Sequence, residues 1–143
     1  GARGQYGMMA PDTALNNWFY KAYMDEYGVF PAQPPYRMVQ GLMGLKMAIE
    51  KAMDNNGGKR PNKDQIAEAF TGLEFEAPGG LVQMKLGNGH QAIQPHAIGK
   101  TAKDKDGNIV VTDIVRYKAS CVNPPNGIKA VDWINAGFPG ADC

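Results

Sequence analysis

Apolar residues recur at three- and four-residue steps in the first half of the chain, which predicts amphipathic helices. The first such segment follows Asp12 or Thr13, either of which can cap a helix, and Gly28 supplies a left-handed stop. Its apolar positions are Leu15, Phe19, Ala22, Tyr23 and Tyr27. We therefore predict one helix between Thr13 and Gly28.

A second and longer helix is predicted after Pro34 and Pro35, which preset the geometry of a first helical turn. The Asn-Asn-Gly-Gly run at 55–58 ends it. Its spacing predicts a broad buried apolar face made of Val39, Leu42, Met43, Leu45, Ile49, Ala52 and Met53.

A third helix is predicted from Asn62, because Asn62 and Gln65 have the spacing of a capping box. It buries Ile66, Ala69 and Phe70, and Gly72 stops it.

Beyond Gly72 the helical period disappears and short extended runs follow, which predicts strands at 73–76, 81–86, 93–100 and 109–119. The turn sequence Asp106-Gly107-Asn108 predicts a hairpin between the last two runs. Residues 1–10 show no sustained periodicity, as expected for an entry strand or crossover segment, and we expect them to form no element of their own.

The order and spacing of these motifs resemble the C-terminal part of the branched-chain amino acid binding proteins of ABC importers. The resemblance covers most of residues 13–118, and Glu76-Ala77 departs from it where the family often has glycine. The matching residues are Phe19, Tyr23, Tyr27, Gly28, Pro31, Tyr36, Ala48, Ile49, Ala52, Phe75, Pro78, Gly79, Gly80, Asn88, His90 and Gln91.

This resemblance implies an α/β fold, namely part of a type I periplasmic-binding-protein fold: a Rossmann-like lobe fragment with three helices, then strands crossing to a second lobe. Residues 1–10 would be the crossover segment and 11–90 the C-terminal part of one lobe. Residues 91–120 would cross the hinge and add strands to the other lobe. A Pro/Gly-rich tail follows at 121–143.

The function implied is solute binding without a chemical step. The chain would be the C-terminal segment of an exported, periplasmic protein that delivers an amino acid or related molecule to an ABC permease. Its first residues lack a hydrophobic signal segment, which we expect upstream. The alternative is a ligand-sensing receptor or regulatory domain of the same fold. An enzyme is disfavoured, since no nucleophile, base and oxyanion set is recognisable.

The candidate ligand-binding residues lie at the start of the second helix. The resemblance places Tyr36 at a helix N-terminus facing the cleft, where a phenol offers apolar contact and one hydrogen bond. Arg37 could reach an anionic group from the same turn, and Gln40 lies one turn further on. The alternative for Tyr36 is a ring packed in the core of its own lobe, and for Arg37 a solvated surface position.

The charge pattern gives no sign of nucleic-acid or metal binding. The chain has 15 Lys and Arg against 14 Asp and Glu, scattered along the sequence without a basic stripe. The two histidines, His90 and His96, fit no zinc spacing, and we expect no cofactor. His90 is more simply explained by a hydrogen bond in a turn.

The remaining features concern the tail and the missing sequence. In an exported protein Cys121 and Cys143 suggest a disulfide, with two free thiols as the alternative.

The two long helices would normally pack on strands supplied by earlier sequence. We therefore expect this fragment to self-associate or to travel with other pieces of its parent.

Overall fold

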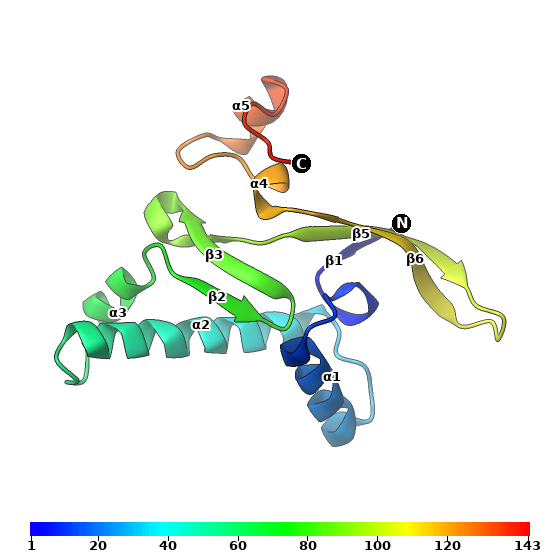
Figure 1. Cartoon of the computed structure of the whole chain (residues 1–143), viewed down its shortest axis with the longest axis horizontal. Helices are drawn as coiled ribbons and strands as arrows, with labels where there is room; N and C mark the ends of the chain where they lie inside the picture. The colour runs from blue at the N-terminus through cyan, green and yellow to red at the C-terminus, as the bar shows by residue number, and fades with distance from the viewer.

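The computed structural model describes residues 1–143 and combines helices with two small antiparallel sheets (Figure 1). No helix has both the length and the apolar character needed to span a bilayer. In chain order the elements are β1 (Ala2–Gly4), η1 (Gly7–Met9), α1 (Ala14–Tyr27), α2 (Gln33–Asn55), α3 (Lys63–Ala69), β2 (Glu74–Ala77), β3 (Gly80–Leu86), η2 (Gly87–Gly89), β4 (Gln91–Ile93), β5 (His96–Lys103), β6 (Ile109–Tyr117), α4 (Ala119–Val122) and α5 (Ala130–Asn135).

Local signals set the starts of α1, α2 and α3 and the end of α1 where the sequence predicts, whereas α3 ends at Ala69, before the predicted stop at Gly72. The Thr13 side chain accepts a hydrogen bond from the Asn16 N–H at 3.1 Å, and Gly28 ends α1 in the left-handed region. Proline occupies the first turn of α2. Asn62 and Gln65 form the reciprocal capping box at the start of α3.

The sheet β2-β3-β4 packs against α2 and α3, and the larger of the two apolar cores lies between the sheet and these helices. Neighbouring strands run antiparallel, and Phe75 pairs with Val82. The core consists of Ala48, Ala52, Ala69, Leu73, Phe75, Ala77 and Val82. Small alanines on the helices let the sheet approach closely, so larger strand residues fill most of the space.

The second sheet has the order β1-β5-β6 and brings the start of the chain against its later part. Arg3 in β1 pairs with Ile98 in β5, and β5 continues into a hairpin with β6. The backbone N–H of Asp104 closes this hairpin on the Asn108 carbonyl at 3.0 Å, so the predicted turn is confirmed. The expectation that residues 1–10 form no element is wrong. They contain β1 and η1, and β1 forms because its partner strand, β5, comes much later in the chain.

Two further sequence predictions are wrong in part. The extended run predicted at 93–100 is divided between β4 and β5, with Gln94 and Pro95 outside both strands. The apolar face predicted for α2 is only partly buried: Leu42 is 58% exposed and Leu45 42%. The sheet packs on the side of α2 that carries Gly44 and Ala48, so these two leucines remain largely exposed.

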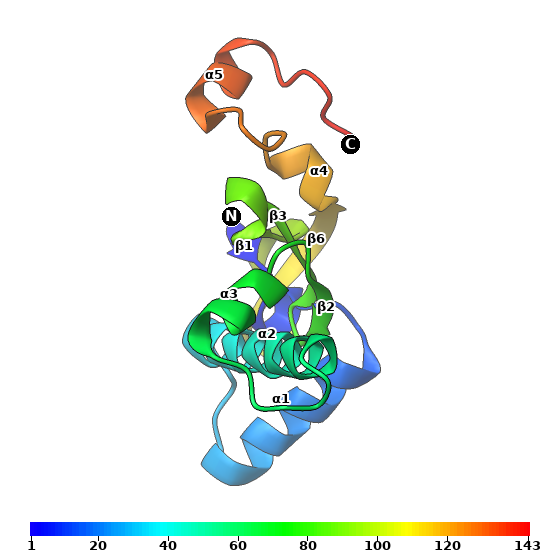
Figure 2. The ribbon, with the colours of Figure 1, turned by 90° about the vertical axis from the view of Figure 1, so that its left-hand side faces the viewer.

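The tail forms a small separate unit beyond β6 (Figure 2). A disulfide joins Cys121 to Cys143, as the sequence suggests. Trp133 on α5 is buried against Phe138 with ring centroids 5.1 Å apart, and its indole N–H donates to the Pro139 carbonyl at 3.0 Å. The helices α4 and α5 are absent from the sequence prediction, since both are too short to show a period.

Candidate functional site

Tyr36 lies in the first turns of α2, and its ring packs between helices. It is 2% exposed and meets Phe19 of α1 edge to face, with centroids 4.9 Å apart. Its hydroxyl donates to the side-chain oxygen of buried Asn16 at 2.7 Å. Burial raises the pKa of the Tyr36 phenol, because the charged phenolate would lose its hydration. In this chain Tyr36 therefore fastens α1 to α2.

Arg37 and Gln40 lie on a more exposed side of α2 than Tyr36 and contact each other. An Arg37 guanidinium nitrogen donates to the Gln40 side-chain oxygen at 2.9 Å and also to that of Gln94. Gln94 comes from the connection between β4 and β5, and its amide nitrogen is buried without an acceptor. Arg37 and Gln40 thus form a hydrogen-bonded cluster with Gln94, a residue that the sequence analysis did not single out.

A hollow of about 500 Å³ opens between the start of the chain and the α1–α2 connection. It is mostly apolar, and Arg3 contributes its single charged side chain. The lining residues are Gly1, Ala2, Arg3, Tyr6, Gly7, Met8, Met9, Tyr20, Phe30, Pro31, Ala32 and Val111. Small-molecule sites have volumes of about 300–1,000 Å³, so this hollow has the size of a ligand site.

Aromatic rings form walls of this hollow. Tyr20 of α1 stacks on Phe30 with centroids 5.9 Å apart and ring planes inclined by 27°. The Tyr6 ring lies directly over Gly4, where an added Cβ would come within 2.3 Å of a ring carbon. A side chain at position 4 would therefore displace Tyr6 from the wall.

Arg116 of β6 holds the turn that forms the floor of the hollow. Its two terminal nitrogens donate to the carbonyls of Met9 at 2.7 Å and Ala10 at 2.9 Å. These bonds tie η1 to the sheet β1-β5-β6. The floor is thus fixed by a residue more than a hundred positions later in the chain.

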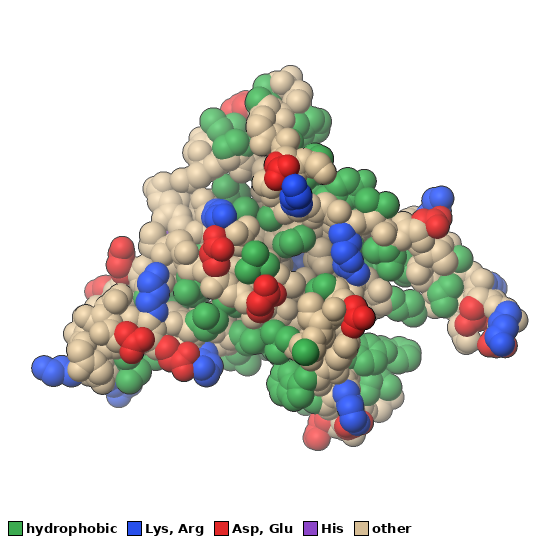
Figure 3. Space-filling model, viewed as in Figure 1, with side chains coloured by type: hydrophobic (Ala, Val, Ile, Leu, Met, Phe, Trp, Pro, Cys, Tyr) green, Lys and Arg blue, Asp and Glu red, His purple; other side chains and the backbone are tan.

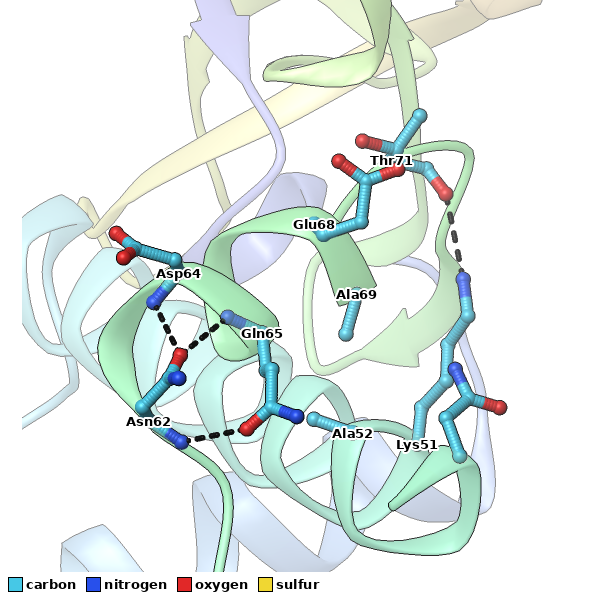
Figure 4. Close-up of a pocket in the computed structure, with 9 residues that line it drawn as sticks. Lys51, Ala52, Asn62, Asp64, Gln65, Glu68, Ala69 and Thr71 are labelled. Carbon is cyan, nitrogen blue, oxygen red and sulfur yellow. Dashed lines mark hydrogen bonds between the residues drawn. The ribbon is translucent and has the colours of Figure 1, made fainter.

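A second hollow, of about 480 Å³, lies between the end of α2 and α3 (Figure 4). Its polar groups bond to one another: Asn62 and Gln65 cap α3, and the Lys51 ammonium donates to the Thr71 carbonyl at 3.3 Å. Because these bonds complete a helix start and hold the following loop, we assign this hollow a structural role.

The ionisable residues of the chain do not converge on a common point. No three His, Cys, Asp or Glu side chains are arranged to hold a metal ion. The backbone N–H of His90 donates to the Gly87 carbonyl at 3.2 Å, which is a turn hydrogen bond.

Comparison with solved structures identifies the fold of this chain. A solute-binding protein of an ABC transporter from Rhodopseudomonas palustris BisB5, in complex with 3,4-dihydroxybenzoic acid, matches 82% of this chain with a TM-score of 0.62 and 24% identity. An ABC-type branched-chain amino acid transporter protein from Rhodopseudomonas palustris CGA009 also matches 82%, with a TM-score of 0.67 and 19% identity. The chain has the fold of part of an ABC-transporter solute-binding protein.

A leucine-binding protein from Thermotoga maritima MSB8 matches 79% of the chain, with a TM-score of 0.58 and 21% identity. At such identities the likeness establishes the fold: the partial type I periplasmic-binding-protein architecture that the motifs predict is confirmed. This chain spans 29–30% of the length of these three proteins. No family model and no curated protein matches the sequence.

Proposed function

We propose that this chain is a portion of the solute-binding component of an ABC importer for branched-chain amino acids or related small molecules. The observation that carries the proposal is the fold, shared over 76–82% of the chain with several solute-binding proteins of ABC transporters. Those proteins include one in complex with p-hydroxybenzoic acid. The proposed role is capture and delivery, with no covalent step.

The proposed mechanism is closure of two lobes around the solute. Residues 11–90 would belong to one lobe, and the sheet β1-β5-β6 would carry the chain across the hinge to the other. Tyr36, Arg37 and Gln40 are the proposed solute-binding residues: Arg37 and Gln40 would contact the solute, and Tyr36 would hold the start of α2 in place through the packing described above. The closed form would be the one that an ABC permease recognises, in the periplasm.

A solute screen on the complete protein tests this function. We expect at least one amino acid or related acid to raise its melting temperature, since a ligand that binds the native state stabilises it. Replacing Arg37 with alanine should weaken binding of that ligand by about 10- to 100-fold, because a charge-assisted hydrogen bond contributes about 1.5–3 kcal/mol. Calorimetry on both proteins gives the ratio.

The matched control is Lys46→Ala on the same helix. Lys46 is exposed and pairs with Glu50 one turn away, so its loss should leave solute affinity unchanged. A complete protein that binds none of the screened solutes would contradict the proposed function. Equal affinities in the wild type and in Arg37→Ala would remove Arg37 from the site.

Self-association of the isolated chain is a separate expectation, based on apolar side chains left uncovered. Met38, Leu42 and Leu45 form a stripe along α2 and are 67%, 58% and 42% exposed. Figure 3 also shows hydrophobic side chains gathered around α1. A stripe of this kind favours association because water contact with it is unfavourable.

Sedimentation measurements on residues 1–143 should give a dimer or a larger species. Leu42→Glu should shift the population toward monomer, because a charge within a buried apolar contact is strongly unfavourable. Thr101→Glu adds one negative charge at an exposed position of β5, away from the stripe, and should leave the population unchanged. A wild-type chain that sediments as a single monomer would overturn this expectation.

A further inference from the structure

We propose that Gln94 is a further residue of the solute site, a positioning residue that holds Arg37 so that one edge of its guanidinium is free for an anionic group. This inference rests on the proposed function and deepens it. Gln94 lies between β4 and β5, in the segment proposed to cross the hinge, 57 positions after Arg37. It would act through Arg37 and would not touch the solute.

The hydrogen bonds of Arg37 occupy only one of its nitrogens. Nη1 donates to the side-chain oxygens of Gln40 and Gln94, whereas Nε and Nη2 donate to no group of this chain. The N–H groups of a guanidinium form a rigid fork, so the edge made by Nε and Nη2 matches a group with two anionic oxygens. Both partners of Arg37 are neutral and it forms no ion pair, so its charge is not offset by this chain.

The amide of Gln94 is oriented by Arg37. Because arginine carries only donors, the amide oxygen must face it and the amide nitrogen must point away. That nitrogen is buried without an acceptor. A buried donor without a partner is unfavourable, so the amide gives up a hydrogen bond of its own to hold Arg37. Conflicts of this kind are typical of functional sites.

The backbone around Gln94 suits it to this role. Pro95 follows directly, and a residue before proline is confined to extended conformations. The flanking strands β4 and β5 belong to different sheets, so the connection is held at both ends. Arg37 is exposed and would otherwise lose much rotamer freedom when it binds a ligand. A fixed acceptor at Gln94 removes part of that cost in advance.

The first measurement is NMR relaxation of the Arg37 Nε–H group in residues 1–143. We expect this group to be more ordered than that of Arg60, which is also exposed. Gln94→Ala and Gln94→Met should lower its order to that of Arg60, since neither side chain offers an amide oxygen. Gln94→Met keeps the length of the side chain, so it carries the test if the alanine variant does not fold. Gln94→Glu restores an acceptor and should restore the order.

The second measurement follows the same Arg37 signal while acetate replaces chloride at constant ionic strength. Gln94→Met should weaken acetate binding about fivefold, the effect expected when one long side chain must be ordered during binding. Gln94→Glu should also weaken it, although Arg37 stays ordered, because the added carboxylate offsets the charge of Arg37. A purely structural role for Gln94 would leave acetate affinity equal in Gln94→Met and the wild type.

The matched control is Gln91→Met, which changes an exposed glutamine of β4 and should alter neither measurement. An Arg37 group that is equally ordered in the wild type and Gln94→Met, equal acetate affinities in these two proteins, or a wild type that does not bind acetate would overturn the proposal. If the complete protein still binds a solute, such a result leaves the proposed function standing. A complete protein that binds no solute would instead overturn the function, while the order and acetate response of Arg37 would still support its positioning by Gln94.

Discussion

Replacing Tyr36 with alanine is expected to lower the free energy of unfolding by about 3–5 kcal/mol, the range for removing a large buried aromatic side chain. The ring is 2% exposed, packs against Phe19 and joins α1 to α2. Its loss also leaves the buried oxygen of Asn16 without its donor. Urea unfolding followed by circular dichroism measures the change.

The matched control for this substitution is Tyr27→Ala, which removes an exposed tyrosine at the end of α1. Tyr27 is 63% exposed, and its main aromatic partner is Tyr23, with centroids 4.6 Å apart. Its removal should change the unfolding free energy by about 1 kcal/mol or less. Similar losses for Tyr36 and Tyr27 would contradict the packing role assigned to Tyr36.

The raised pKa of Tyr36 adds a pH dependence to the same experiment. Burial raises the pKa above the ordinary value of 10.0, so the folded state holds this proton more strongly than the unfolded state. The resulting stability is fully present below pH 10 and is lost as the pH rises through the folded-state value. Tyr36→Phe should remove this part of the alkaline destabilisation. If the free energy of unfolding falls with pH above 10 equally steeply in Tyr36→Phe and in the wild type, Tyr36 is not its source.

The sequence predicts the helix ends because the responsible interactions are local. Thr13 caps α1 through a residue three positions away, and Asn62 and Gln65 cap each other across the same spacing. Such contacts depend on nearby residues alone, so a pattern reveals them. The fold follows from the sequence for a different reason: the motifs occur in the order found in solute-binding proteins.

The hollow could not be predicted because distant segments build it. Arg3 lies on β1, Tyr20 on α1 and Val111 on β6, and the pairing of β1 with β5 brings them together. No period or short motif encodes such a pairing. For the same reason the sequence could not show whether Tyr36 faces a cleft or the core, and its ligand-contacting role stays a prediction.

Removing the Cys121–Cys143 disulfide is expected to unfold the tail while α1, α2 and α3 persist. The bridge closes a loop with a sequence separation of 22, and constraining a loop of that size contributes about 3 kcal/mol. The other ties near the chain end are a 3.5 Å hydrogen bond from the Asp142 N–H to the Ser120 carbonyl and the Lys118–Asp142 ion pair, in which both side chains are largely exposed. Such a pair contributes about 1 kcal/mol at most.

The fluorescence of Trp133 reports unfolding of the tail, provided that Trp18 is first replaced by phenylalanine. Trp18 is 63% exposed, so the replacement is mild, and the remaining indole is buried against Phe138. In the Cys121→Ser and Cys143→Ser double variant, we expect Trp133 emission to shift toward that of a solvated indole. Circular dichroism should retain the signal of the long helices.

The selective loss follows from where the contacts of the tail lie. Trp133 bonds to Pro139 and packs on Phe138, all within the disulfide loop, so these contacts depend on its closure. One long hydrogen bond of 3.5 Å, from the Asn88 N–H to Asn126, joins the loop to η2. Buried Trp133 emission in the double variant would show that the loop holds itself together without the bridge. Simultaneous melting of α1 and α2 would show instead that the tail supports the core.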